Sequence, residues 1–150
     1  MTAAASGPVL FAYDGSDQAA NAISVAGRQL RADRDALVLT IWRPFAVEFQ
    51  PVRKIRFNAA DIEQVRKAAE ETAAHGASLA EAAGFRAQSV AAETSPTWKG
   101  IVDAADEHDA SLIVLGSQGH SGLVSVMLGS AALAVAAHSR RSVLIVHADH

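Results

Sequence analysis

Residues 116–130, GSQGHSGLVSVMLGS, decide the fold that we expect for this chain. They follow an apolar run at residues 112–115 that predicts a buried strand. They precede an alanine-rich segment at residues 131–137 that predicts a helix. A strand, a glycine-rich loop and a helix in this order form the phosphate-binding unit of many α/β proteins. The stretch therefore predicts an α/β domain with a site for an anionic ligand.

The residue types within the loop suit an anion. Because Gly116, Gly119, Gly122 and Gly129 have no Cβ, the backbone can turn sharply and bring its N–H groups close to a phosphate. Ser130 adds a hydroxyl at the start of the next helix, where several N–H groups lack intrahelical partners. Taken alone, these glycines are equally consistent with a tight strand-to-helix connection that binds no ligand.

Apolar runs alternate with helical periodicity along the rest of the chain. Strands are expected at residues 9–13, 37–42, 85–92, 112–115 and 143–146. Helices are expected from the Asp14-Gly15-Ser16 turn to residue 31, between the N-cap Asn58 and the stop Gly84, from Ser95-Pro96 onward, and at residues 131–138. Residues 43–57 show no clear period and predict a long loop.

This alternation predicts one domain over residues 1–150. We expect a three-layer α/β sandwich with a five-stranded parallel, Rossmann-like sheet and helices on both faces. Connections between parallel strands are almost always right-handed, which restricts the possible topologies. Strand order 3-2-1-4-5 places the first and fourth strands side by side. Their carboxyl ends then border a ligand crevice, with Asp14 ending one strand and Gly116 the other.

Composition bounds the partners and the compartment. The chain has a formal net charge of −3, which does not favour nucleic acid as a partner, and it has no cysteine for a disulfide or a thiolate site. No apolar run approaches the roughly 20 residues that span a bilayer, and the first residues lack the pattern of a signal peptide. We therefore expect a cytoplasmic protein with neither nucleic acid nor membrane as partner.

The same residues resemble the universal stress protein family. Its nucleotide-binding members carry G-x2-G-x9-G-[S/T], and Gly116, Gly119, Gly129 and Ser130 complete this pattern. The resemblance covers nearly the whole chain, including the Asp14 turn and the long second helix. It implies ATP or another adenine nucleotide (ADP, AMP or cyclic AMP) as ligand, with Mg²⁺ as an optional companion. It also implies a homodimer that pairs through the C-terminal strand.

Position by position, the resemblance implies a binding site of three parts. The end of the first strand, with Ala12, Tyr13 and Asp14, approaches the adenine and ribose, and Ile41 near the end of the second strand lines the adenine pocket. The remaining residues surround the ribose and phosphates: Leu115, Gly116, Ser117, Gly119, His120, Ser121, Gly122, Gly129, Ser130 and Ala131.

The charge of this site leaves the number of phosphates open. No Lys or Arg occurs from residue 116 to 137, so a triphosphate would depend on backbone N–H groups, the helix end, His120 and Mg²⁺. An exposed helix end contributes only ~0.3–1 kcal/mol. Whether Arg140 or Arg141 reaches the phosphates also stays open.

Asp14 has alternatives of its own: a ribose hydrogen bond, Mg²⁺ binding or a cap on the first helix. Trp98 is expected to pack on the core rather than stack on a base.

Three functions follow from these patterns. The first is a stress-response regulator that binds an adenine nucleotide in the crevice between strands one and four. The second is a slow ATPase or nucleotide-transfer enzyme on the same site, although no catalytic or metal-ligating constellation stands out and the P-loop lysine is absent. The third is an interaction module that binds no nucleotide.

Overall fold

The computed structural model describes residues 7–31, 33–43, 59–94, 96–118 and 128–148. Strands and helices alternate as the sequence predicts, with small shifts at their ends. In chain order the elements are β1 (Val9–Ala12), α1 (Asp17–Gln29), β2 (Asp35–Trp42), α2 (Ala59–Ala82), β3 (Arg86–Glu93), α3 (Thr97–Glu107), β4 (Leu112–Gly116), α4 (Ser130–His138) and β5 (Ser142–Val146). The predicted N-cap Asn58 and most of the predicted loop at 43–57 lie outside the described residues.

The five strands form one parallel sheet in the order β3-β2-β1-β4-β5, which confirms the predicted topology. β1 lies in the middle, with Val9 in register with Ala36 of β2 on one side and with Leu112 of β4 on the other. Val9, Leu10 and Phe11 are buried because the strand has a neighbour on each side and helices above and below. A central strand of this kind is expected to be apolar throughout.

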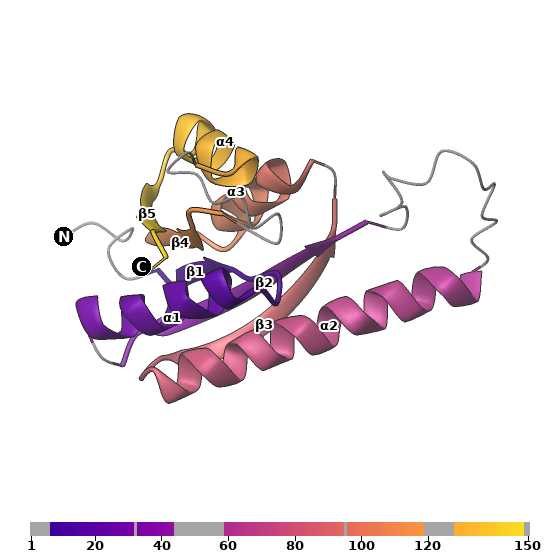
Figure 1. Ribbon diagram of the computed structural model, residues 1–150, viewed down its shortest axis with the longest axis horizontal. Helices are drawn as coiled ribbons and strands as arrows, with labels where there is room; N and C mark the ends of the chain where they lie inside the picture. Colours follow the sequence, from indigo (N-terminus) through magenta and orange to yellow (C-terminus); the bar gives the residue numbers. More distant parts are fainter. Residues whose placement is uncertain (1–6, 32, 44–58, 95, 119–127, 149–150) are drawn as a thin grey trace.

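Helices cover both faces of the sheet in pairs. α1 and α2 lie on one face, and α3 and α4 lie on the other (Figure 1). The core is accordingly divided into two clusters by the sheet. Phe11 and Phe85 meet edge to face on the side of α1 and α2, with ring centroids 5.2 Å apart. Leu10, Ile101, Ile113 and Val135 anchor the cluster on the side of α3 and α4.

The long helix α2 lies close to the sheet and ends as predicted. A Cβ at Gly76 would lie 2.6 Å from Cδ2 of Tyr13, so a glycine is needed for this approach. Gly84 has φ +105° and ends the helix. There Gly84 N donates to Glu81 O, and Phe85 N donates to Ala80 O, in the Schellman arrangement. Among the described residues, no helix combines the length and apolarity that a membrane crossing requires.

Candidate functional site

A pocket of about 480 Å³ opens at the edge of the sheet where β1, β2 and β4 end and α3 and α4 begin. Its size falls within the range of small-molecule sites, roughly 300–1,000 Å³. The order β2-β1-β4 places the end of β1 in the middle of the pocket floor. This is the edge at which open α/β sheets bind ligands.

The predicted site residues meet at this pocket. All those that the structure describes line it: Ala12, Tyr13, Asp14, Ile41, Leu115, Gly116, Ser117, Gly129, Ser130 and Ala131. Gly119, His120, Ser121 and Gly122 lie outside the described residues. The structure thus brings together residues that are more than a hundred positions apart in sequence. That they contact a ligand stays a prediction.

Hydrogen bonds fix the turn after β1. Thr40 Oγ1 donates to the carbonyl oxygen of Tyr13 over 2.8 Å, which ties the strand end to β2. Asp14 Oδ1 accepts from Ser16 N at 2.9 Å, and Ser16 Oγ accepts from Ala19 N at 3.1 Å. Ser16 is therefore the N-cap of α1, and the capping role considered for Asp14 belongs to Ser16. Asp14 itself shapes the turn and remains exposed at the pocket.

The ring of Tyr13 belongs to the core rather than to the pocket side of the sheet. Tyr13 is 4% exposed and belongs to the cluster beneath α1 and α2, whereas α3 and α4 bound the pocket on the other face. Burial raises the pKa of the Tyr13 phenol, and the negative charges of Asp14 and Asp17 raise it further. A ligand in the pocket would therefore meet Tyr13 mainly through its backbone.

The β4–α4 connection frames the polar end of the pocket. Ser117 N donates to Val146 O at 2.9 Å, and Gly129 N donates to Ser117 O at 2.6 Å, so Ser117 joins the end of β5 to the residue that precedes α4. Gly129 is the N-cap of α4 and supplies no side-chain cap. The first N–H groups of a helix have no intrahelical partner, so the start of α4 offers donors beside Ser130. This end of the pocket suits an anion.

The opposite end of the pocket is largely apolar and lies where β2 ends against α3. Leu39, Ile41, Ile101 and Trp98 line it. A Cβ at Gly100 would lie 2.8 Å from Cδ1 of Ile41, so α3 packs directly on this side chain. Such a surface can hold the flat face of a base, and the turn at Asp14 lies between it and the start of α4.

The sequence interpretation missed pocket residues at the end of β2 and the start of α3. Arg43 is among them, together with Pro96 and Thr97. Residues two apart on a strand share one face, so the spacing from Ile41 to Arg43 was the available signal. Arg43 is the one Lys or Arg among the described residues of the pocket lining. Trp98 packs against the core as expected, and it also lines the pocket.

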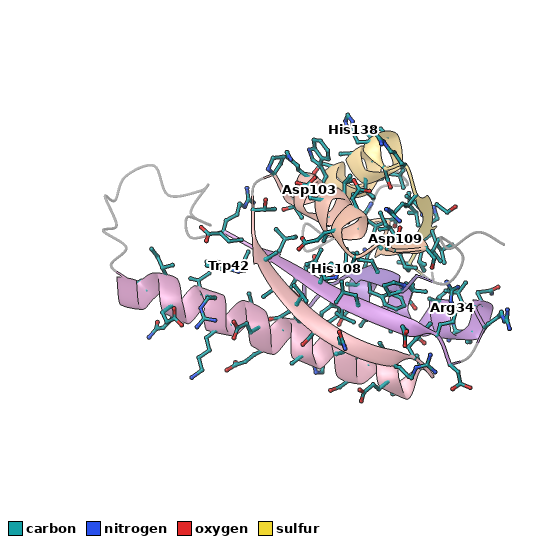
Figure 2. All side chains as sticks on the ribbon, turned by 180° about the vertical axis from the view of Figure 1, so that it is seen from behind. Arg34, Trp42, Asp103, His108, Asp109 and His138 are labelled. Carbon is teal, nitrogen blue, oxygen red and sulfur yellow. The ribbon has the colours of Figure 1, made fainter. Side chains whose placement is uncertain are left out.

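Arg141 lies at the amino-terminal end of β5, at the end of the sheet opposite the pocket. It precedes the first residue of β5, where its side chain donates to Asp106 and Asp109 at 3.1 Å and to the carbonyl oxygen of Ala110 at 2.6 Å. Burial acts to lower the pKa of Arg141, but the hydrogen bonds and charges of the two aspartates outweigh it and raise the pKa. Figure 2 labels Asp109 near the end of α3. Arg141 therefore joins α3 to β5 and does not serve the pocket.

Comparisons with known proteins agree with this architecture. A model described as the universal stress protein family matches residues 6–147. A universal stress protein solved in complex with cAMP is 26% identical, with a TM-score of 0.69 over 97% of this chain and 99% of that one. No curated protein matches the sequence.

Two further solved structures share the fold. One is a hypothetical protein whose biochemical function was assigned from its structure. It is 21% identical, with a TM-score of 0.75 over 97% of this chain and 99% of that one. The other is the universal stress protein from Archaeoglobus fulgidus in complex with dAMP. It is 24% identical, with a TM-score of 0.62 over 93% of this chain and 96% of that one.

The burial of Tyr13 predicts that its phenol ionises at a higher pH than an exposed tyrosine does. Tyr13 is the only tyrosine in the chain, so an ultraviolet absorbance titration of the folded protein reports this phenol alone. We expect the phenolate to form at a pH above the ordinary pKa of about 10. Since the folded pKa is the higher one, the associated stability is present below pH ~10 and is lost as the pH rises through the folded pKa. Ionisation at or below the ordinary pKa would contradict the packing of Tyr13.

Proposed function

The chain belongs to the universal stress protein family, and from this premise we propose that it binds an adenine nucleotide in the pocket at the carboxyl ends of β1 and β4. The ligand class comprises ATP, ADP, AMP and cyclic AMP. The proposal rests on the order in which three chemical environments follow one another along the pocket. An apolar end, a carboxylate and an uncapped helix start follow one another from β2 through β1 to β4.

The base would occupy the apolar end. Ile41 and Ile101 provide flat contact there, and burial of apolar surface contributes about 25 cal/mol per Å². Arg43 lies on the same strand end, roughly 10 Å from β4 because two strand spacings separate β2 from β4. Arg43 therefore enters the pocket from the side of β2, next to the end proposed for the base.

The ribose and phosphates would occupy the other end. Asp14 is positioned between the two ends, where a carboxylate can accept hydrogen bonds from ribose hydroxyls. The start of α4, with Gly129 as N-cap and Ser130 as first residue, offers N–H donors and a positive helix end to a phosphate. The solved relative that is 26% identical holds cAMP, which supports an adenine nucleotide with few phosphate charges.

Mg²⁺ would enter with the nucleotide rather than bind beforehand. The described part of the chain contains no group of three or more acidic or histidine side chains that could hold a metal. Mg²⁺ commonly binds one or two carboxylates together with substrate phosphates, and Asp14 is the carboxylate that lines the pocket. A di- or triphosphate is therefore expected to gain more from Mg²⁺ than AMP does.

We further propose that the protein acts as a cytoplasmic regulator and as a homodimer. β5 is an edge strand of the sheet, and its apolar residues Val143, Leu144 and Ile145 are only half-buried. Leu133 on α4, which packs beside β5, is 58% exposed. An apolar edge strand needs a partner or a cover, and a second copy of β5 would supply both backbone and side-chain contacts.

Filling the phosphate end of the pocket tests the nucleotide site. Ala131 lines the pocket in the first turn of α4, so Ala131→Phe places a ring where the phosphates would lie. We expect calorimetry to show binding of AMP, ADP, ATP or cAMP to the wild type and at least about tenfold weaker binding to this variant, a loss of ~1.4 kcal/mol. Ala136→Phe is the matched control, because Ala136 lies exposed on the same helix outside the pocket. No heat with any of these nucleotides at millimolar concentration would overturn the proposal.

Sedimentation tests the dimer. At micromolar concentration we expect the mass of two chains for the wild type. Leu133→Glu should raise the dimer dissociation constant by about tenfold or more, because a buried leucine contributes about 1.5–3 kcal/mol. Since Leu133 is exposed in the single chain, the variant should fold normally. A wild type that sediments as a monomer would contradict the pairing through β5.

A further inference from the structure

We propose that Trp98 and His138 form a positioning pair that holds α4 in the orientation needed to bind a nucleotide. This inference rests on the proposed function and concerns residues outside the glycine motif. The indole of Trp98 and the imidazole of His138 stack with ring centroids 4.4 Å apart and an interplanar angle of 21°. The pair joins the second residue of α3 to the last residue of α4. Figure 2 labels His138 at the end of α4.

Trp98 belongs to the pocket as well as to the pair. It lines the apolar end together with Pro96 and Thr97 from the start of α3. One face of the indole is covered by His138, so the pocket is contacted by the opposite face or by a ring edge. The position of His138 therefore influences how the indole meets whatever occupies the apolar end.

α4 packs on the core through one face. It comprises nine residues, and only Ala132 and Val135 are buried. The helix is short, spanning about 12 Å from its first to its last residue, and much of it is alanine with little side chain to pack. At its start, Gly129 N donates to Ser117 O, which fixes one end. The aromatic stack adds a contact with α3 at the other end of the helix, beyond those of the buried Ala132 and Val135.

The two attachments lie at opposite ends of the helix that would bind the phosphates. If the stack is lost, the last turn of α4 is no longer held against α3, and a small tilt of the helix about the buried Val135 would change the direction of the N–H groups beside Ser130. Binding through aligned donors depends on their direction, because hydrogen bonds prefer a donor angle above ~150° and weaken steeply below ~120°. The pair consequently links the apolar wall at Trp98 to the phosphate end at Ser130, although neither ring needs to contact a phosphate.

Nucleotide calorimetry and thermal unfolding of stack variants test this role. We expect His138→Ala to weaken nucleotide binding about three- to tenfold, in line with the contribution of an aromatic pair, while the unfolding midpoint changes little because His138 is exposed. His138→Phe keeps a ring against Trp98 and should restore binding. His108→Ala is the matched control, since His108 is an exposed histidine at the far end of α3, outside the pocket lining.

Coupling between the rings is measured by a double-mutant cycle and by fluorescence. The affinity losses of Trp98→Ala and His138→Ala should be less than additive, because either change alone breaks the stack. In a Trp42→Phe background Trp98 is the only tryptophan. In this background the emission of Trp98 should change when His138→Ala is added, even without ligand. It should also change when nucleotide is added to the Trp42→Phe protein that retains His138.

The outcomes separate this role from the proposed function. If the wild type binds nucleotide and His138→Ala binds equally well, or if His138→Phe fails to rescue, the positioning role is overturned and the nucleotide site stands. If His138→Ala loses affinity only in proportion to a lowered unfolding midpoint, the stack is merely structural and the proposal fails. A wild type that binds no nucleotide overturns both.

Discussion

The position of β1 between β2 and β4 is the constraint on which the rest of the structure depends. Val9, Leu10 and Phe11 are buried, and the strand is paired on both sides, so the middle of the sheet is fixed by backbone hydrogen bonds and apolar packing together. The chain leaves β1 toward β2 through α1 on one face and reaches β4 through α3 on the other. Because these connections diverge, the carboxyl ends of β1 and β4 face open space, and the pocket forms there.

The chemistry of the pocket follows from this geometry. Strand order sets the sequence of environments: the apolar end of β2 under α3, the Asp14 turn after β1, and the uncapped start of α4 after β4. Close packing keeps these parts in place, since Gly100 lets α3 rest on Ile41 and Gly76 lets α2 rest on Tyr13. At the amino-terminal end of β5, Arg141 is engaged by Asp106 and Asp109 and supports the fold, whereas Arg43 lines the pocket.

Much of this could be predicted from the sequence because the decisive signals are local. Apolar runs, helical periodicity and the glycine spacing gave the elements, and the crossover rule then gave the strand order and the neighbourhood of Asp14 and Gly116. Contacts between side chains distant in sequence could not be predicted in the same way. The Trp98–His138 stack joins residues forty positions apart, and the commitment of Arg141 to Asp106 and Asp109 depends on where α3 ends. For Arg43, which follows the last residue of β2, the two-residue spacing from Ile41 was the one local signal.

We propose that one pocket binds base and phosphate at opposite ends of the β2-β1-β4 edge. The most direct measurement is a nuclear magnetic resonance titration of isotope-labelled protein with AMP. We expect the amide resonances of Ile41 and Trp98 to shift together with those of Gly129, Ser130 and Ala131, while those around Arg141 stay unchanged. Shifts confined to the opposite edge of the sheet, around Asp35 and Arg86, or no shifts at saturating AMP, would contradict it.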